Sequence, residues 1–280
     1  FGVDKDGKNQ KDLTPFEKVT TGVVDDLKDN PNEMLIQMNK ENPQVFDVYR
    51  INVNTGEMIV VGQNPGNITG WQTDHNGKLR IAITTDGVNQ SVLYRDSEDQ
   101  EFKPLLTTTF KETFAPLFFT FDNKNLYVSS NIGRDKASIV EYDIANKKEI
   151  KVLYENPAYD VNGLSYSRKR KVIEFANYTG WKQEYHFFDK ETKDIYNDLT
   201  SKLPGKELFV TGINKNEDKF LVRTYSDKSL GSFYFYNVKT KELSMLTEVS
   251  PWLNEEHLAD QKPITYKTRD GLTIHGYLTL

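Results

Sequence analysis

One short stretch of the sequence approaches the pattern of a serine nucleophile. The Gly-x-Ser-x-Gly turn of many hydrolases holds its serine on a sharp corner between a strand and a helix. Residues 163–167 (Gly-Leu-Ser-Tyr-Ser) lack the final glycine and fall on a segment that alternates like a strand. We therefore predict that Ser165 is an ordinary strand residue, and we assign no catalytic residue to this chain.

Metal and cofactor chemistry also finds little support in the residue types. The chain has no cysteine, which excludes disulfides, thiolate metal sites and cysteine nucleophiles. Its four histidines are far apart, and no pair shows the close spacing of zinc ligands. They are His75 in a polar turn, His186 on a strand, His257 in a linker and His275 near the C-terminus. We predict no metal site and no cofactor.

The composition excludes two classes of partner. The 280 residues carry a net charge of −5 and contain no basic block, so we expect no nucleic-acid partner. The longest strongly apolar run, residues 115–121, is far too short to cross a bilayer. Zero cysteine and a low net charge fit cytoplasm and periplasm equally, and abundant Asn, Lys and Tyr indicate a bacterial source.

The elements that would position any site repeat along the chain. An aromatic or β-branched strand that ends in Asp or Asn and enters a polar turn recurs six times. Its turn-entry residues are separated by 48, 44, 47, 46 and 48 positions: Asp4, Asn52, Asp96, Asp143, Asp189 and Asn237. A polar turn followed by an apolar strand keeps the same period, at Met34, Leu79, Leu126, Val172 and Phe220. Two independent signals with one period indicate a repeat architecture.

Each period has room for four short strands. In the third unit we expect strands at 116–121, 126–130, 138–144 and 149–154. A four-stranded antiparallel unit repeated every 40–50 residues is typical of β-propeller blades, such as WD40-like repeats. The sequence therefore predicts an all-β propeller with five full blades. They span residues 16–60, 61–106, 107–154, 155–204 and 205–248, and residues 1–15 are predicted to be the outer strand of a preceding, incomplete blade.

The repeat ends near residue 248. Residues 249–262 contain Pro251 and predict an exit linker after the propeller of residues 1–248. Residues 263–280 form two alternating segments joined by Arg269-Asp270-Gly271, and Asp-Gly between such segments predicts a hairpin. This hairpin is out of phase with the blades and is expected to begin a different domain.

These C-terminal residues resemble the junction between propeller and hydrolase in the prolyl oligopeptidase family of serine peptidases. The resemblance is closest to the acylaminoacyl-peptidase and dipeptidyl-peptidase branches, and the upstream propeller agrees with it. It is carried by Leu246, Pro251-Trp252-Leu253, Leu258-Ala259, Pro263-Ile264, Arg269-Asp270-Gly271-Leu272-Thr273-Ile274 and Gly276-Tyr277-Leu278.

The resemblance implies that residues 263–280 begin an α/β-hydrolase catalytic domain and that the propeller gates access to its active site. The implied partners are this hydrolase domain, a short peptide substrate and a second subunit of a homo-oligomer. The implied Ser, His and Asp triad lies outside the chain, so the chain alone is expected to be inactive. Dipeptidyl peptidases hold the substrate amine with a Glu pair inside the propeller, whereas Glu255-Glu256 lies in the linker and is expected to be solvated.

Loops between the second and third strands of each blade emerge on one face of a propeller. Arg134, Trp181 and Asp227 lie in these loops and are our candidates for a substrate channel or a domain interface. An arginine can pair with a peptide carboxylate and a tryptophan can supply an apolar wall. The alternative interpretation is a non-enzymatic propeller scaffold that binds protein or glycan. The terminal hairpin discriminates between the two, because a scaffold has no reason to append it.

Overall fold

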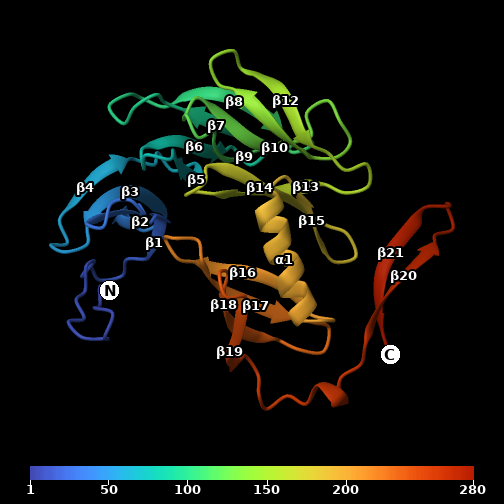
Figure 1. Ribbon diagram of the computed structural model, residues 1–280. Helices are drawn as coiled ribbons and strands as arrows, with labels where there is room; N and C mark the ends of the chain where they lie inside the picture. The colour runs from blue at the N-terminus through green and yellow to red at the C-terminus, as the bar shows by residue number, and fades with distance from the viewer. The chain divides into compact units, whose positions relative to one another are not determined.

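The fold consists almost entirely of small antiparallel sheets. The computed structural model describes all residues from Phe1 to Leu280, and the chain divides into two compact units, Phe1–Glu155 and Asn156–Leu280 (Figure 1). The sheets follow one another along the chain, and each is formed by strands that are consecutive in sequence. This is the organisation of β-propeller blades, and it confirms the predicted fold class.

The first unit contains three four-stranded sheets. In each of them neighbouring strands pair antiparallel in chain order. The strands are β1 (Thr21–Asp25), β2 (Glu33–Asn42), β3 (Val45–Asn52), β4 (Met58–Gly62), β5 (Ile68–Thr73), β6 (Leu79–Thr85), β7 (Asn89–Tyr94), β8 (Lys103–Thr109), β9 (Phe114–Phe119), β10 (Asn125–Ser130), β11 (Ser138–Asp143) and β12 (Lys148–Tyr154). The four strands predicted for the third repeat are each found within two residues of the expected bounds.

The second unit contains a three-stranded sheet with a helix, a four-stranded sheet and a terminal hairpin. A short 3-10 helix, η1, precedes the hairpin. The antiparallel pairing of its two strands confirms the hairpin that the sequence predicted. The elements are β13 (Val161–Ser167), β14 (Val172–Thr179), β15 (Gln183–Phe187), α1 (Lys190–Lys202), β16 (Glu207–Ile213), β17 (Lys219–Tyr225), β18 (Ser232–Asn237), β19 (Glu242–Glu248), η1 (Glu255–His257), β20 (Gln261–Lys267) and β21 (Thr273–Thr279).

Within the first unit the hydrophobic cores lie between successive sheets. Leu35 and Val48 of the first sheet share a cluster with Leu79 of the second. Ile81 of the second sheet shares another with Phe119 of the third. Because β6 lies between two such clusters, both of its faces are buried, which is the packing that stacked blades require. No helix of the chain is long and apolar enough to span a membrane.

Two expectations from the sequence differ from the structure. The repeat at 155–204 has three strands, and α1 replaces the fourth. Asp189, which the sequence placed at a hairpin turn, instead caps the helix by accepting a hydrogen bond from the backbone amide of Thr192. Residues 1–15 form no outer strand: they contain one isolated bridge, Gly2 to Lys11, and Leu13 packs against the core of the first sheet.

Helix α1 forms because burial and local charge both favour it. Ile195, Tyr196 and Leu199 follow helical spacing and are at most 9% exposed. Lys190 and Lys202 each form an ion pair with an aspartate four residues away on the helix surface. This pattern competes with the strand repeat, and packing of the apolar face against the neighbouring sheet decides in favour of the helix.

Candidate functional site

The sheet formed by β16–β19 ends at the side of its blade where the loop between the second and third strands lies. In this sheet Glu207 pairs with Tyr225, and Ser232 pairs with Glu248. The loop between β17 and β18 and the last residues of β19 therefore lie at the same end of the strands. The segment that follows β19 therefore begins at the end of this sheet where the loop that carries Asp227 emerges.

Trp181 contacts the terminal hairpin directly. It lies in the loop between β14 and β15, and its ring centroid is 5.2 Å from that of His275 and 5.7 Å from that of Tyr277. Both ring pairs are edge-to-face, a favourable arrangement for aromatic side chains. The Tyr277 hydroxyl also donates a hydrogen bond to the Trp181 carbonyl oxygen. The hairpin thus packs against Trp181 at the tip of the loop between β14 and β15.

Asp227 and Lys228 contact the start of the same hairpin. The Asp227 carboxylate accepts a hydrogen bond of 2.8 Å from the backbone amide of Gln261, which lowers the pKa of Asp227. Lys228 lies 3.0 Å from a carboxylate oxygen of Asp260, and this pairing raises the pKa of Lys228. The two neighbouring residues therefore hold the chain at the point where β20 begins.

The linker between the propeller and the hairpin is anchored as well. Glu255 of η1 lies with both carboxylate oxygens 3.0 Å from the Lys206 ammonium. A hydrogen bond from Ser229, followed by Lys206, lowers the pKa of Glu255. Glu255 and Glu256 are both exposed, as expected for a solvated linker, and Glu255 in addition pairs with a residue of the propeller.

Arg134 lies in the first unit and forms an ion pair within its own blade. Its guanidinium contacts both carboxylate oxygens of Glu149, at 2.6 and 3.3 Å, and the Ser130 carbonyl oxygen at 3.2 Å. Its charge is therefore matched locally. Trp181 and Asp227 lie in the second unit, and both contact the terminal hairpin.

Three other residues considered from the sequence, Ser165, His75 and His186, are hydrogen-bonded or partly buried. Ser165 lies on β13, and its hydroxyl donates a 2.9 Å hydrogen bond to Glu174 of the neighbouring strand β14. His75 Nε2 lies 2.8 Å from the Phe119 carbonyl oxygen, and partial burial lowers the pKa of His186. No group of three or more His, Cys, Asp or Glu side chains is arranged to hold a metal ion.

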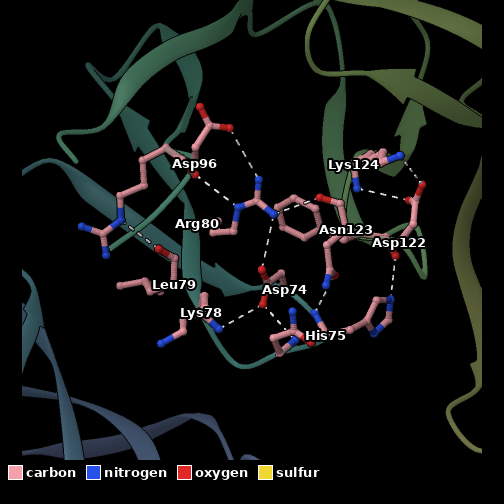
Figure 2. Close-up of polar contacts among 12 residues, drawn as sticks. Asp74, His75, Lys78, Leu79, Arg80, Asp96, Asp122, Asn123 and Lys124 are labelled. Carbon is pink, nitrogen blue, oxygen red and sulfur yellow. Dashed lines mark hydrogen bonds and ion pairs between the residues drawn. The ribbon is translucent and has the colours of Figure 1, made fainter. Parts of the chain in front are cut away.

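A buried arginine network joins the β5–β8 and β9–β12 sheets of the first unit (Figure 2). It lies at the strand ends opposite the loop that carries Arg134. Arg80 of β6 is 8% exposed, contacts Asp74 at 3.3 Å and donates a 2.9 Å hydrogen bond to the Asn123 carbonyl oxygen. Asn123 in turn accepts a hydrogen bond from the His75 backbone amide. This network was not predicted from the sequence, although an arginine inside Leu-Arg-Ile-Ala-Ile was a visible signal for it.

No family model matches the chain. Over an alignment of 292 positions it is 27% identical to dipeptidyl aminopeptidase BIII of Pseudoxanthomonas mexicana, covering 100% of this chain and 41% of that protein. The structure of Porphyromonas gingivalis dipeptidyl peptidase 4 matches 98% of this chain and 45% of its own, with 12% identity and a TM-score of 0.56. Prolyl oligopeptidase B from Galerina marginata, bound to a 35mer substrate, matches 91% of this chain and 38% of its own, with 13% identity and a TM-score of 0.59.

The chain spans well under half the length of the curated relatives it matches. The structural matches have low sequence identity and show the shared fold, whereas the sequence match extends along the whole chain. The relatives and structural neighbours are prolyl oligopeptidases and dipeptidyl peptidases, and they confirm for this β-propeller chain its resemblance to the prolyl oligopeptidase family.

Proposed function

We propose that this propeller gates the access of short peptides to the active site of a prolyl-oligopeptidase-type serine peptidase. The observation that carries the proposal is the terminal segment, residues 249–280. Its hairpin pairs with no blade, yet it is bound to the loop end of the last two repeats through Trp181, Asp227 and Lys228. A segment of this kind is what a propeller needs if a catalytic domain is to be joined at that face.

The surface of the hairpin supports the same proposal. Leu272, Tyr266 and Tyr277 are 61%, 55% and 51% exposed, and both edges of the two-stranded sheet lack a further strand. An isolated hairpin is marginally stable, and exposed apolar side chains together with open edges favour cover by further structure. In the proposal, an α/β-hydrolase domain that begins with residues 263–280 provides this cover and carries the Ser, His and Asp of the triad.

The candidate residues take different roles in this proposal. Trp181 and Asp227 lie at the interface between propeller and catalytic domain, where they set how closely the two can approach. Arg134 is the candidate for the wall of the substrate channel, where its ion pair with Glu149 holds the guanidinium in one position. Each of these roles can be tested by mutation.

The test compares the 280-residue chain with the full-length protein encoded by its gene. Internally quenched peptides of increasing length are supplied to both. We expect the chain alone to match buffer, and the full-length protein to cleave short peptides in a reaction abolished by a serine-directed inhibitor. In the full-length protein, Trp181→Ala should raise kcat/KM for long peptides relative to short ones, because it loosens the contact that holds the domains together.

Trp252→Ala is the matched control, because this tryptophan is 81% exposed in the linker. It should leave the ratio of long to short peptide cleavage unchanged. Equal cleavage of long and short peptides by the unmodified protein would refute the gating role. Absence of any inhibitor-sensitive cleavage would favour the non-enzymatic scaffold, which binds protein or glycan.

A further inference from the structure

The helix in the fourth repeat leaves a cavity beside it. An α-helix with its side chains is about 10–12 Å across, so it cannot follow a sheet edge as closely as a fourth strand would. The resulting cavity has a volume of about 270 Å³ and lies among β13, β14, the first half of α1, and β16 and β17 with their connecting turn. All of its lining residues belong to the second unit.

One wall of the cavity is apolar. The helix contributes Ile195 and Tyr196, and the strands around it contribute rings and branched side chains. The apolar lining residues are Phe175, Ile195, Tyr196, Val210, Ile213, Phe220 and Val238. Several of them belong to the core that holds α1 against the last sheet, so this wall is part of a packed structure.

The opposite end of the cavity presents hydrogen-bond acceptors. The Glu174 carboxylate accepts hydrogen bonds from Ser165 at 2.9 Å, Arg170 at 3.1 Å and Thr192 at 3.2 Å. Glu217 accepts from the Ser167 hydroxyl and from the Lys169 backbone amide. These donors are already committed to carboxylates, whereas carboxylate oxygens have lone pairs to spare. A ligand at this end must therefore donate.

The charges of the cavity also favour a cation. Four carboxylates line it, from Glu174, Glu191, Glu217 and Asp218, against three basic side chains. Arg170 is shared among Asp189 at 2.6 Å, Glu174 at 3.1 Å and Glu191 at 3.4 Å. Lys239 contacts Asp218 at 2.7 Å, and Lys169 donates to the Asn216 carbonyl oxygen. Three basic side chains against four carboxylates leave the lining of the cavity with one net negative charge.

A second, independent observation points to a ligand. Tyr196 lines the cavity and is 9% exposed, and no hydrogen bond within the protein engages its hydroxyl. The oxygen is reached by solvent, so it is open to a molecule that enters the cavity. Its oxygen can accept a hydrogen bond as well as donate one, and its ring face attracts cations. The helix therefore places an unused polar atom beside a group of acceptors.

We propose that this cavity binds a small organic ammonium ion, with its charged end at Glu174 and Glu217 and its aliphatic part against Ile195 and Val238. Carboxylates and an aromatic ring meet the donors and the charge of the ammonium group, while the apolar wall meets the carbon chain. The volume suits a ligand of a few carbon atoms. The proposal does not depend on the peptidase assignment, because the cavity lies within the propeller chain.

The experiment uses n-pentylammonium, with 1-pentanol and pentanoate as probes of equal length. Each is titrated into the isotopically labelled 280-residue chain up to millimolar concentration, and amide resonances of α1 and β14 are followed by NMR. We expect saturable shifts with pentylammonium and weaker or no binding of the other two. Tyr196→Phe should weaken binding about fivefold, the effect of one hydrogen bond.

Val238→Phe should abolish binding by filling the cavity without altering its charge, so the proposal stays testable if Tyr196→Phe disturbs folding. Tyr225→Phe is the matched control, because its hydroxyl bonds Glu207 outside the cavity and its loss should not change binding. Three results would overturn the proposal: no saturable shift with pentylammonium, equal binding of the alcohol, or binding unaffected by both Tyr196→Phe and Val238→Phe. The first would mean that the cavity holds water alone.

Discussion

Replacing Arg80 by methionine is the sharpest test of how neighbouring blades are joined. The guanidinium lies between β5–β8 and β9–β12 and is stacked 4.8 Å from the Phe119 ring (Figure 2). Methionine retains an unbranched side chain of similar reach, so the aliphatic packing is largely kept. The substitution therefore removes the polar contacts and leaves the apolar ones.

The magnitude follows from those contacts. Arg80 donates to two backbone carbonyl oxygens, of Asn123 at 2.9 Å and Arg95 at 3.3 Å, and contacts Asp74, whose side chain is 5% exposed. Removing one partner of a buried ion pair costs about 3–5 kcal/mol. Asp74 keeps hydrogen bonds from the Asn76 and Lys78 amides, and Asp96 is 73% exposed, so both moderate the loss. We expect Arg80→Met to lower the free energy of unfolding by about 3 kcal/mol.

The assay is equilibrium urea unfolding followed by the fluorescence of Trp71, which lies in the same sheet as Arg80. Trp181 and Trp252 are replaced by phenylalanine in every variant, so that the signal reports the first unit alone. Lys124→Met is the control, because this lysine is a neighbouring cation that is 79% exposed and 3.9 Å from Asp122. It should cost less than about 0.5 kcal/mol.

The reasoning fails if Arg80→Met costs less than about 1 kcal/mol, or no more than Lys124→Met. In that case the network would be no stronger than an exposed ion pair. A change in the denaturant slope would indicate that the variant alters which parts of the chain unfold together, and the unfolding of the two units would then be measured separately.

Two further predictions concern single carboxylates. Asp86 accepts hydrogen bonds from the backbone amide and then the side-chain amide of Asn89, and they lower its pKa to about 2. Asn89→Ala removes only the side-chain bond and should raise this pKa part of the way toward 3.8, measured by NMR titration; an unchanged value would contradict the assignment. Because the folded-state pKa is lowered, the stabilisation is present above the unfolded pKa and is lost as pH falls toward 2. The buried Tyr236 hydroxyl donates a 2.6 Å hydrogen bond to Asp198 of α1, so Tyr236→Phe should cost about 1.5 kcal/mol in urea unfolding, whereas Tyr266→Phe, on the exposed hairpin, should cost nothing measurable.

The period of the chain was predictable because it depends on local chemistry. Tight turns need Asp, Asn or Gly at fixed places, and the strands between them need apolar side chains. Gly77 illustrates the turn requirement: its φ is +72°, and a Cβ there would lie 2.3 Å from the Leu27 side chain. The hairpin at 263–280 was predictable for the same reason, since Gly271 occupies a turn position with a φ of +87°.

The helix was not predicted, because two local patterns overlap at residues 186–194. The strand ending and the aspartate fit the repeat, while the same Asp189 fits a helix cap. The choice depends on whether the next residues can bury an apolar face, and that face meets Phe220 and Tyr236 of the following repeat. Such contacts are remote in sequence and leave no local signal.

The candidate site was predictable only in part. The loops that carry Trp181 and Asp227 followed from the strand order. Their contact with His275, Tyr277 and Gln261 did not, because nothing local joins residues that are 34 to 96 positions apart. The contact of Glu255 with Lys206 was not predicted for the same reason, since the two residues are 49 positions apart.

The sequence by itself determined the repeated strands, their turns and the point where the repeat stops, because backbone geometry and side-chain alternation are short-range requirements. Only the tertiary structure decided where a helix replaces a strand, which charges are buried between blades, and where the terminal hairpin is held. These outcomes depend on burial and on pairing between distant segments, and the free energy of such contacts exists only once the chain is folded.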